Sequence, residues 1–244
     1  MTTGILLAGG TGSRLKPLTK VTNKHLLGVG LKPMINYSLR QFQQMGFNQV
    51  IVVTGKEHAG HIIQYIGDGS DYNFKVAYVV QEHPGGIGHA IGLCKNFVGK
   101  GDPIAVLLGD NIFMDDLADY YECFSSFYGA KGAFCLLKEV DTPERYGVAT
   151  VKDEMIIKIA EKPKKPESNL AVTGCYFFDE KVWKIIKTLK PSGRGEIEVT
   201  DILNHYIKME WLHWDKLQEP WTDAGTPESY KKANLMMWEE EICQ

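Results

Sequence analysis

Residues 4–15 read Gly4-Ile5-Leu6-Leu7-Ala8-Gly9-Gly10-Thr11-Gly12-Ser13-Arg14-Leu15. The apolar run that ends at Ala8 is typical of a buried strand. Glycines follow it at once, and a backbone without side chains lets N–H groups approach an anion closely. Arg14 adds a planar guanidinium group that suits a phosphate. The stretch therefore predicts a strand followed by a phosphate-binding loop, with a plain strand-to-helix turn as the alternative.

The glycine loop matches neither of the two commonest phosphate-binding fingerprints. A dinucleotide fingerprint needs a third glycine in G-x-G-x-x-G, but Leu15 stands at that position. A P-loop needs a lysine after its second glycine. Gly4 and Gly9 have the required spacing, but Gly10 stands where the lysine should be. The loop is thus directed to phosphate in some other way.

The composition is that of an ordinary globular protein of 244 residues. A net charge of −3 argues against a nucleic-acid-binding surface. No apolar run reaches the roughly 20 residues that span a bilayer, and no basic and apolar leader opens the chain. The cysteines are Cys94, Cys123, Cys135, Cys175 and Cys243. Their odd number and wide spacing favour reduced thiols in a cytoplasmic protein over a disulfide framework or a zinc site.

The first half of the chain alternates apolar strands with helical segments. The pattern predicts strands at 5–8, 50–53, 76–80 and 104–108, and helices at 33–45, 60–66 and 86–97. Repeated β-α units predict a doubly wound sheet that is covered by helices on both faces.

The second half carries strand-like segments with short connections. Strands are predicted at 133–137, 147–151, 156–160, 171–178 and 212–217, and helices at 182–189, 197–209 and 227–242. Together the two halves predict a single α/β domain, 1–244, with a Rossmann-like, doubly wound mixed sheet that is predominantly parallel and has three layers.

Polar residues follow several of the predicted strands, at the sheet edge where ligands of such folds bind. Asp110 comes directly after strand 104–108, and Asp223 precedes a glycine and a helix start. Mg²⁺ prefers one or two carboxylates together with phosphate oxygens. Turn formation or helix capping explains either aspartate taken singly. Gln81 opens a second glycine-rich loop, where a side-chain amide beside open N–H groups can pair with a base.

Taken together, the motifs resemble the sugar-1-phosphate nucleotidylyltransferases, and within them the glucose-1-phosphate thymidylyltransferases. The segments that carry the resemblance are 9–15, 23–27, 32–35, 108–111, 143–148, 161–163, 171–174, 194–196 and 221–226. They occur in the family's order over nearly the whole chain.

The resemblance implies that a sugar phosphate oxygen attacks the α-phosphorus of a nucleoside triphosphate directly, with dTTP and glucose 1-phosphate as substrates and pyrophosphate as leaving group. Such a reaction depends on positioning and charge neutralisation. The resemblance further implies Mg²⁺ held by Asp110 and Asp223, a homo-oligomer, a nucleotide-binding half at about 1–130 and a sugar-binding half at about 131–244.

The family's functional residues map onto individual positions of this chain. Nucleotide contacts are expected at Gly9, Gly10, Gly12, Arg14, Lys24, Gln81, Gly86 and Asp110. Sugar-phosphate contacts are expected at Gly147, Glu161, Lys162, Thr173, Tyr176 and Arg194. The catalytic residues are expected to be Arg14, Lys24, Lys162 and Asp110. By resemblance, Arg14 and Lys24 offset the charge of the departing pyrophosphate, and Lys162 neutralises the sugar phosphate.

The chain departs from the family at three places. His25 stands where many long-form members have glutamine, Gly28 replaces a frequent proline, and Gly88-His89 replaces a frequent Ala-Gln in the base-side loop. His89 can alter contacts to the base or the ribose, and a few contacts to the base and the sugar hydroxyls set the choice of substrates. UTP or another sugar 1-phosphate is therefore an alternative. The chain also ends one helix after Asp223, without the helices that build a regulatory site in longer members or a β-helix tail. We therefore expect little feedback inhibition and no acyltransferase activity.

Two other classes compete with this interpretation. A nucleotide-sugar-dependent glycosyltransferase shares the general architecture, since fold does not determine function. Such enzymes often carry a D-x-D metal motif, and this sequence has none. A non-catalytic sensor of sugar nucleotides would be expected to lose the phosphate and metal residues, and all of them are present here.

Overall fold

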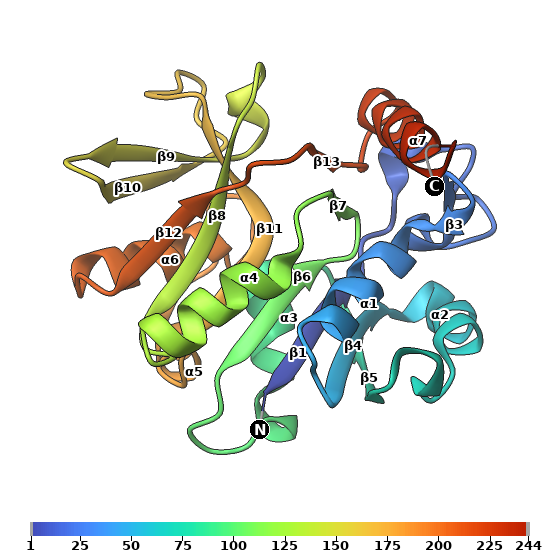
Figure 1. Cartoon of the computed structure of the whole chain (residues 1–244), viewed down its shortest axis with the longest axis horizontal. Coiled ribbons are helices and arrows are strands. Elements are labelled where there is room, and N and C mark those ends of the chain that lie inside the picture. The colour runs from blue at the N-terminus through green and yellow to red at the C-terminus, as the bar shows by residue number, and fades with distance from the viewer. Residues whose placement is uncertain (1, 243–244) are drawn as a thin grey trace. The chain divides into compact units, whose positions relative to one another are not determined.

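The computed structural model describes residues 2–242, with side chains described to residue 239, and the chain forms two compact units (Figure 1). The first, here the N-terminal unit, comprises Thr3–Pro84, Leu107–Ala118 and the chain from Glu219 onward. The second, here the central unit, comprises Gly85–Val106 and Asp119–Gln218 with Thr2. The units therefore interleave along the sequence. The division into nucleotide-binding and sugar-binding halves within a single domain stays a prediction.

The N-terminal unit is built on a parallel sheet of β1 (Thr3–Ala8), β4 (Gln49–Gly55) and β5 (Lys75–Gln81). Every residue of β1 is buried, as are the five central residues of β4. Strands covered on both faces need continuous apolar runs, which is the pattern that predicted them.

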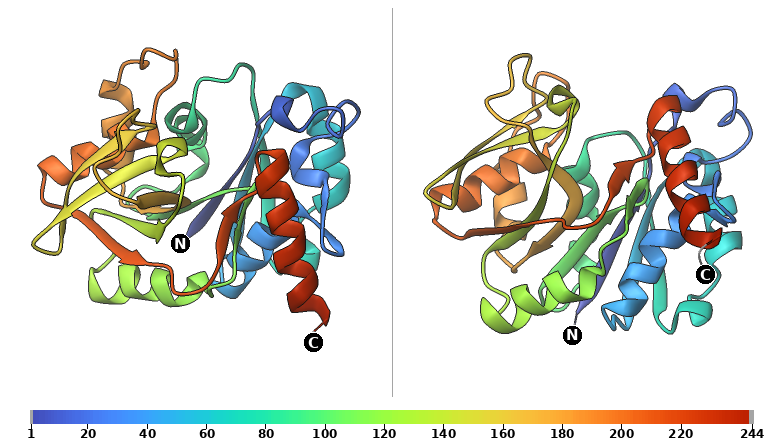
Figure 2. Two further views of the ribbon diagram at one scale, coloured as in Figure 1. Left: turned by 90° about the horizontal axis from the view of Figure 1, so that it is seen from above. Right: turned by 45° about the horizontal axis from the view of Figure 1, so that its top comes forward.

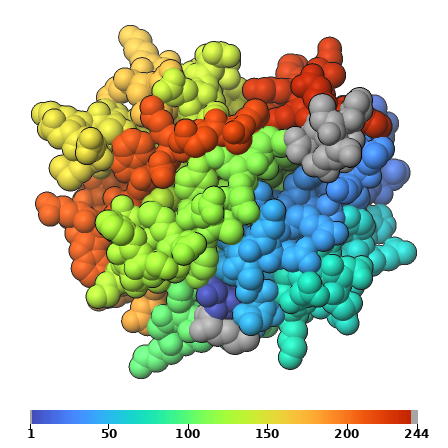
Figure 3. Space-filling view, viewed as in Figure 1, coloured from blue at the N-terminus to red at the C-terminus, as the bar shows by residue number. Residues whose placement is uncertain are grey.

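Three α-helices belong to the N-terminal unit, and the predicted positions of all three are confirmed to within a residue or two. They are α1 (Met34–Gln44), α2 (Ala59–Ile66) and α7 (Pro227–Ile242). α1 packs on β1, α2 packs on β4, and α7 lies against β2. Figure 3 shows the red surface of α7 beside the blue N-terminal residues. The Thr226 side chain caps α7 by accepting a hydrogen bond from the Ser229 N–H at 3.3 Å.

Two short strand pairs complete this unit, and the sequence pattern did not predict either. They are β2 (Gly28–Val29) with β3 (Lys32–Pro33), and β7 (Asn111–Phe113) with β13 (Trp221–Asp223). Two- and three-residue strands are too short for an alternating pattern to stand out. The second pair nevertheless brings together distant segments that carry candidate site residues.

The central unit contains a mixed sheet. β8 (Ala133–Glu139) pairs parallel with β12 (Leu212–Lys216) and antiparallel with β11 (Leu170–Phe178). β9 (Gly147–Lys152) pairs with β11 and forms a long antiparallel hairpin with β10 (Met155–Glu161), seen in yellow-green in Figure 2. A parallel sheet in one unit and a mixed sheet in the other confirm the predicted mixed α/β class.

The helices of the central unit are α3 (Ile87–Leu93), α5 (Val182–Thr188) and α6 (Val199–Lys208), and α3 contacts the other two. The helix predicted at 86–97 is therefore shorter, and the one predicted at 197–209 begins two residues later. β6 (Ile104–Leu108) and α4 (Leu117–Glu122) each contain a crossing of the chain from one unit to the other. The sequence pattern predicted neither α4 nor the π-helical turn Cys123–Phe127 that follows it.

Single-turn 3₁₀ helices occur at Ser13–Leu15, Lys24–Leu26, Lys56–His58, Ser70–Tyr72, Lys95–Phe97 and Pro143–Arg145. No helix within residues 2–242 is long and apolar enough to cross a bilayer. Cys94, Cys135 and Cys175 are buried free thiols, and burial raises the pKa of Cys94 and of Cys135 to about 12. These thiols stay protonated near neutral pH, in agreement with the prediction of reduced cysteines. Cys243 lies outside the described residues.

Candidate active site

The glycine loop after β1 closes over the side chain of Lys24. A Cβ atom on Gly10 would lie 2.9 Å from Lys24 Cε, and one on Gly12 would lie 2.8 Å from Lys24 Cβ. Gly12 also has a φ of +64°, which favours glycine. The glycines are therefore needed for close approach to Lys24, in addition to the open N–H groups that the sequence suggested.

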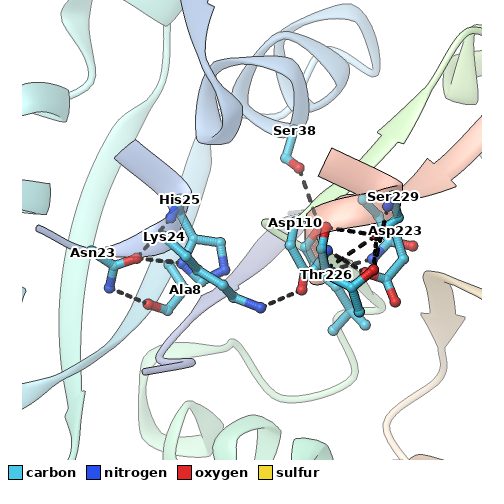
Figure 4. Close-up of polar contacts among 12 residues, drawn as sticks. Ala8, Asn23, Lys24, His25, Ser38, Asp110, Asp223, Thr226 and Ser229 are labelled. Atoms are coloured by element: carbon cyan, nitrogen blue, oxygen red, sulfur yellow. Dashed lines mark hydrogen bonds and ion pairs between the residues drawn. The ribbon is translucent and has the colours of Figure 1, made fainter. Parts of the chain in front are cut away.

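Asn23 and His25 hold Lys24 in place from either side. The Asn23 side-chain NH₂ donates to the Ala8 carbonyl at 3.1 Å, so its Oδ1 accepts from the His25 N–H at 2.9 Å and from His25 Nδ1 at 2.6 Å. Burial, helped by the charge of Lys24, lowers the pKa of His25 to about 3. His25 is therefore neutral, with its proton on Nδ1, and adds no charge to the site (Figure 4).

Lys24 forms an ion pair with Asp110, the second residue of the turn between β6 and β7. Lys24 Nζ donates to Asp110 Oδ2, and both side chains are largely buried. The other oxygen, Asp110 Oδ1, accepts a hydrogen bond from the Asn111 side chain at 3.1 Å. Burial alone would raise the pKa of Asp110, but the adjacent ammonium of Lys24 outweighs it and holds that pKa well below the usual range.

The pairing of β7 with β13 brings Asp223 to the same place. Asp223 pairs in register with Asn111, and the Ala224 N–H donates to the Asp110 carbonyl at 2.8 Å. Figure 4 shows both aspartates on the side of the site opposite Asn23 and His25. Asp223 Oδ1 accepts a hydrogen bond from the Gly225 N–H at 2.6 Å, as the turn alternative predicts, and the strand pairing in addition places Asp223 beside the Asp110 turn.

Arg14 and the two aspartates gather around Gly225. A Cβ atom there would lie 2.7 Å from Asp223 Oδ1, 3.4 Å from Asp110 Oδ2 and 3.6 Å from Arg14 Nη2. Two carboxylates that approach the same glycine are hard oxygen donors of the kind that Mg²⁺ takes. Of the residues whose side chains are described, no three of His, Cys, Asp and Glu gather as a metal site. The residues therefore fit a magnesium ion that takes its remaining ligands from phosphate and water.

A pocket of about 110 Å³ lies beside the glycine loop, at the carboxyl ends of β4 and β5. Gln81 lies at its wall, where a Cβ atom on Gly9 would be 3.1 Å from Gln81 Oε1. Lys56 and Glu82 form an exposed ion pair of 2.8 Å between the two strand ends. The pocket lies where the sequence predicted nucleotide contacts, and it has the flat amide that a base edge requires.

The predicted sugar-phosphate residues Gly147, Glu161 and Lys162 lie together in the central unit. A Cβ atom on Gly147 would be 2.8 Å from Thr200 Cγ2 and 3.7 Å from Glu161 Oε2, and Lys162 Nζ is 3.5 Å from Glu161 Oε1. Lys162 has a φ of +42°, which is costly for a residue with a side chain. Such strain often marks functional positions. Thr200 carries no sequence signal and was not predicted.

Arg194 is surrounded by carboxylates. Its Nη2 lies 3.1 Å from Glu161, 3.2 Å from Glu196 and 2.7 Å from Glu198, and its Nε donates to Glu198 at 3.1 Å. Burial would raise the pKa of Glu198, but its hydrogen bonds to Arg194 and Ser192 lower it. The resemblance predicted Arg194 near phosphate. Its guanidinium instead faces Glu196 and Glu198, neither of which was a predicted site residue.

Thr173 and Tyr176 are buried within β11. The Thr173 hydroxyl donates to the Leu136 carbonyl at 3.0 Å and the residue is 1% exposed. Tyr176 is 3% exposed, and its ring stacks on Phe178 with centroids 6.1 Å apart. A sugar contact at either position stays a prediction.

The predicted site residues divide cleanly between the units. The N-terminal unit holds Gly9, Gly10, Gly12, Arg14, Lys24, Gln81, Asp110 and Asp223. The central unit holds Gly86, Gly147, Glu161, Lys162, Thr173, Tyr176 and Arg194. Within each unit, phosphate-directed cations lie beside carboxylates.

Comparison with known proteins agrees with this arrangement. Residues 3–240 match a sequence model described as nucleotidyl transferase. A low-salt glycan biosynthesis nucleotidyltransferase from Haloferax volcanii is 38% identical over 98% of this chain, which spans 66% of that relative. A glucose-1-phosphate thymidylyltransferase from Xanthomonas campestris is 40% identical over 94% of this chain and 78% of its own.

A solved structure supports the same fold. A Bacillus anthracis protein assigned as a glucose-1-phosphate thymidylyltransferase, in complex with sucrose, superposes with a TM-score of 0.92. It is 48% identical, and the match covers 98% of this chain and 96% of that one. The predicted fold class and the resemblance read from the motifs are confirmed.

Proposed function

The chain belongs to the nucleotidyl transferase family, and we propose that it transfers a thymidylyl group from dTTP to glucose 1-phosphate. The products are dTDP-glucose and pyrophosphate. The relatives that bear the name glucose-1-phosphate thymidylyltransferase support this choice of substrates. The Haloferax relative is named for neither a base nor a sugar, so the same chemistry with UTP or another sugar 1-phosphate is the second candidate.

One observation carries the proposal: Arg14, Lys24, Asp110 and Asp223 converge next to the glycine loop of the N-terminal unit. Two cations beside two carboxylates suit a triphosphate that binds together with Mg²⁺, because the carboxylates can hold the metal ion while the cations contact phosphate oxygens. A structural role alone would not require a buried lysine paired with one aspartate and a second aspartate beside the same glycine. We assign the triphosphate to this cluster, with its base in the pocket beside Gln81.

In the proposed reaction, a phosphate oxygen of the sugar attacks the α-phosphorus and pyrophosphate departs. Arg14 and Lys24 hold the triphosphate and stabilise the charge that develops on the leaving group. Mg²⁺, held by Asp110 and Asp223, would supply further neutralisation of phosphate charge when bound. The neutral His25 keeps Lys24 in position without competing for the anion.

The sugar phosphate is assigned to the central unit. Lys162 neutralises its phosphate, Glu161 accepts hydrogen bonds from sugar hydroxyls, and Gly147 contacts the sugar. Thr173 and Tyr176 shape this region from within β11, and Gly86 reads the base from the start of α3. Arg194 can bind a phosphate only if it gives up contacts to its carboxylate partners. Its assignment to the sugar phosphate therefore needs a test of its own.

The decisive experiment is a matrix of dTTP, UTP, CTP, ATP and GTP against several sugar 1-phosphates, read by pyrophosphate release. We expect the highest kcat/KM for dTTP with glucose 1-phosphate, and no release when EDTA is present or either substrate is omitted. A higher kcat/KM with UTP would favour the second candidate. Binding of a nucleotide sugar with no turnover of any pair would instead indicate a sensor.

A homo-oligomer and a cytoplasmic location rest on the resemblance and on the cysteine pattern alone. Light scattering of the purified chain at several concentrations tests the first. A mass equal to that of one chain throughout would overturn it.

A further inference from the structure

The loop before α3 is joined through one residue to the loop that carries Arg194, and both lie in the central unit. The Ile197 N–H donates to the Gly85 carbonyl at 2.8 Å, and the Gly88 N–H donates to the Ile197 carbonyl at 2.9 Å. The backbone of Ile197 is therefore held by the loop that contains Gly86, the proposed base contact.

Two glycines make this close approach possible. Gly86 has a φ of +90°, and a Cβ atom on it would lie 2.6 Å from the Ile197 carbonyl oxygen. A Cβ atom on Gly88 would lie 2.6 Å from Ile197 Cγ2 and 3.3 Å from Ile202 Cδ1. Real Cβ atoms do not approach other atoms so closely, so any side chain at Gly88 has to displace Ile197.

On its other side, Ile197 belongs to the turn that positions Arg194. The Ser192 N–H donates to the Glu196 carbonyl at 2.8 Å, and the Ser192 hydroxyl donates to Glu198 at 2.7 Å. Glu196 and Glu198 flank Ile197 and both contact the Arg194 guanidinium. A displacement of Ile197 therefore moves two of the three carboxylates that hold Arg194.

We propose that Ile197 is a positioning residue that couples the base-side loop Gly85–Gly88 to the Arg194 cluster. When a base is bound at this loop, the coupling determines the position in which Arg194 and its carboxylate partners meet the sugar phosphate. This coupling rests on the proposed function for its kinetic consequence. The physical link itself does not, because it consists of two backbone hydrogen bonds and one packing contact within a single unit.

The glycine at position 88 is what the coupling requires, and it is one of the places where this chain departs from its family. The nearest atom that a Cβ on Gly88 would meet is Ile197 Cγ2, the branch that isoleucine carries on its own β-carbon, and the Ile197 carbonyl oxygen would lie 3.0 Å away. Leucine has no atom at the Cγ2 position. Gly88→Ala should therefore displace Ile197, and Ile197→Leu should remove the closest of the contacts that the alanine creates.

The kinetic test measures KM and kcat for both substrates in Gly88→Ala, Ile197→Leu and the double variant. We expect Gly88→Ala to raise the KM for glucose 1-phosphate about fivefold or more, since overpacking at a close contact shifts the backbone. The double variant should return to within about twofold of the wild type. Gly92→Ala is the matched control, because its Cβ lies on the same helix and has Ile186 Cγ2, at 3.3 Å, as its one close neighbour. It should leave both KM values unchanged.

An Arg194→Met background separates coupling from simple loss of structure. There, Gly88→Ala should no longer change the KM for glucose 1-phosphate, because the group through which Ile197 acts is absent. Thermal unfolding of each variant shows whether the fold is intact. An unchanged KM in Gly88→Ala, no recovery with Ile197→Leu, or an equal effect in the Arg194→Met background would each overturn the proposal.

Hydrogen–deuterium exchange of the ligand-free protein tests the link without any substrate. Amides in 192–198 should exchange faster in Gly88→Ala and return to the wild-type rate in the double variant, while Gly92→Ala leaves them unchanged. Unchanged exchange in Gly88→Ala refutes the coupling, whatever reaction the protein performs. Faster exchange in a protein that turns over no substrate pair refutes the proposed function and leaves the coupling standing.

Discussion

Lys24 in the N-terminal unit and Arg194 in the central unit are both cations that pair with carboxylates, but the carboxylates hold them differently. Lys24 has one carboxylate partner, Asp110, and the two side chains are only 11% and 15% exposed. Arg194 is 41% exposed and shares three glutamates. Removing Lys24 or Asp110 leaves the other as a buried charge without its partner. Arg194 has three carboxylate partners and is itself open to water, so the loss of one contact costs less. This difference indicates that the Lys24–Asp110 pair is fixed in position before ligands bind. The Arg194 cluster, in contrast, can exchange its ion-pair partners.

Replacement of the buried carboxylate should have the largest effect. Asp110→Asn removes both the counter-charge of Lys24 and a hard oxygen donor for Mg²⁺, so we expect turnover to fall about 10³-fold. Steady-state pyrophosphate release measures it. Asp71→Asn changes an exposed aspartate of the same unit and should be neutral. Activity within tenfold of wild type in Asp110→Asn would contradict the proposed role.

A buried carboxylate of the central unit tests whether burial, and not the choice of unit, makes the difference. Asp179 accepts hydrogen bonds from the Tyr206 hydroxyl at 2.7 Å and from the Gly132 and Lys181 N–H groups at 3.0 Å each. Asp179→Ala should lower the free energy of unfolding by about 3 kcal/mol, because these buried donors lose their acceptor. Urea unfolding measures it, with the exposed Glu180→Ala as control. A loss equal to that of the control would count against burial as the cause.

The same contrast can be drawn inside the N-terminal unit with two lysines. Lys24→Met leaves the Asp110 carboxylate unpaired and should lower the free energy of unfolding by about 2 kcal/mol. Lys56→Met breaks an ion pair of 2.8 Å whose side chains are 61% and 70% exposed, and it should cost less than about 0.5 kcal/mol. Equal losses in urea unfolding of the two variants would show that exposure does not control the strength of these pairs.

The smallest effect should come from the Arg194 cluster, and it depends on pH. The pKa of folded Glu198 lies below its ordinary value of 4.5, so its contribution to stability is complete above pH 4.5 and is lost as pH falls through the folded pKa. Arg194→Gln leaves only the Ser192 hydrogen bond and the Lys162 charge to oppose the burial of Glu198, which raises the pKa of Glu198 relative to wild type. The variant should be less stable than wild type by under about 1 kcal/mol at pH 7.

That stability difference should shrink as the pH is lowered below 4.5, since Glu198 becomes protonated in both proteins. Urea unfolding of wild type and Arg194→Gln at pH 4 and pH 7 measures it. A difference that grows on acidification would reverse the sign and show that Glu198 is not the carboxylate that Arg194 stabilises.

Much of the fold and part of the site followed from local pattern. The strand that ends at Ala8, the loop with Gly9, Gly10 and Gly12, and the helix α7 that begins at Pro227 stand where the sequence placed them. These features depend on residues next to one another along the chain. Hydrophobic runs, missing side chains and capping hydroxyls act over a few residues, which is why they can be recognised without a structure.

Other features could not be seen in the same way. Glu198 and Thr200 carry no motif of their own, and Gly88 looked like a departure bearing on the base. Their roles depend on which segments pack together, as when Ile197 meets Gly88 or Thr200 meets Gly147. Thr173 is buried because β11 pairs with β8, and the sequence around Thr173 gives no sign of that pairing.

By itself, the sequence determined a strand followed by a phosphate loop, an α/β order of elements, and a set of cations and carboxylates typical of nucleotidyl transfer. Only the tertiary structure decided that Lys24 meets Asp110, that the pairing of β7 with β13 adds Asp223, and that Arg194 is shared among glutamates. The reason is physical. Glycine freedom and apolar periodicity are properties of neighbouring residues, whereas the strength of a charge pair depends on distance and burial, which exist only once distant segments are folded together.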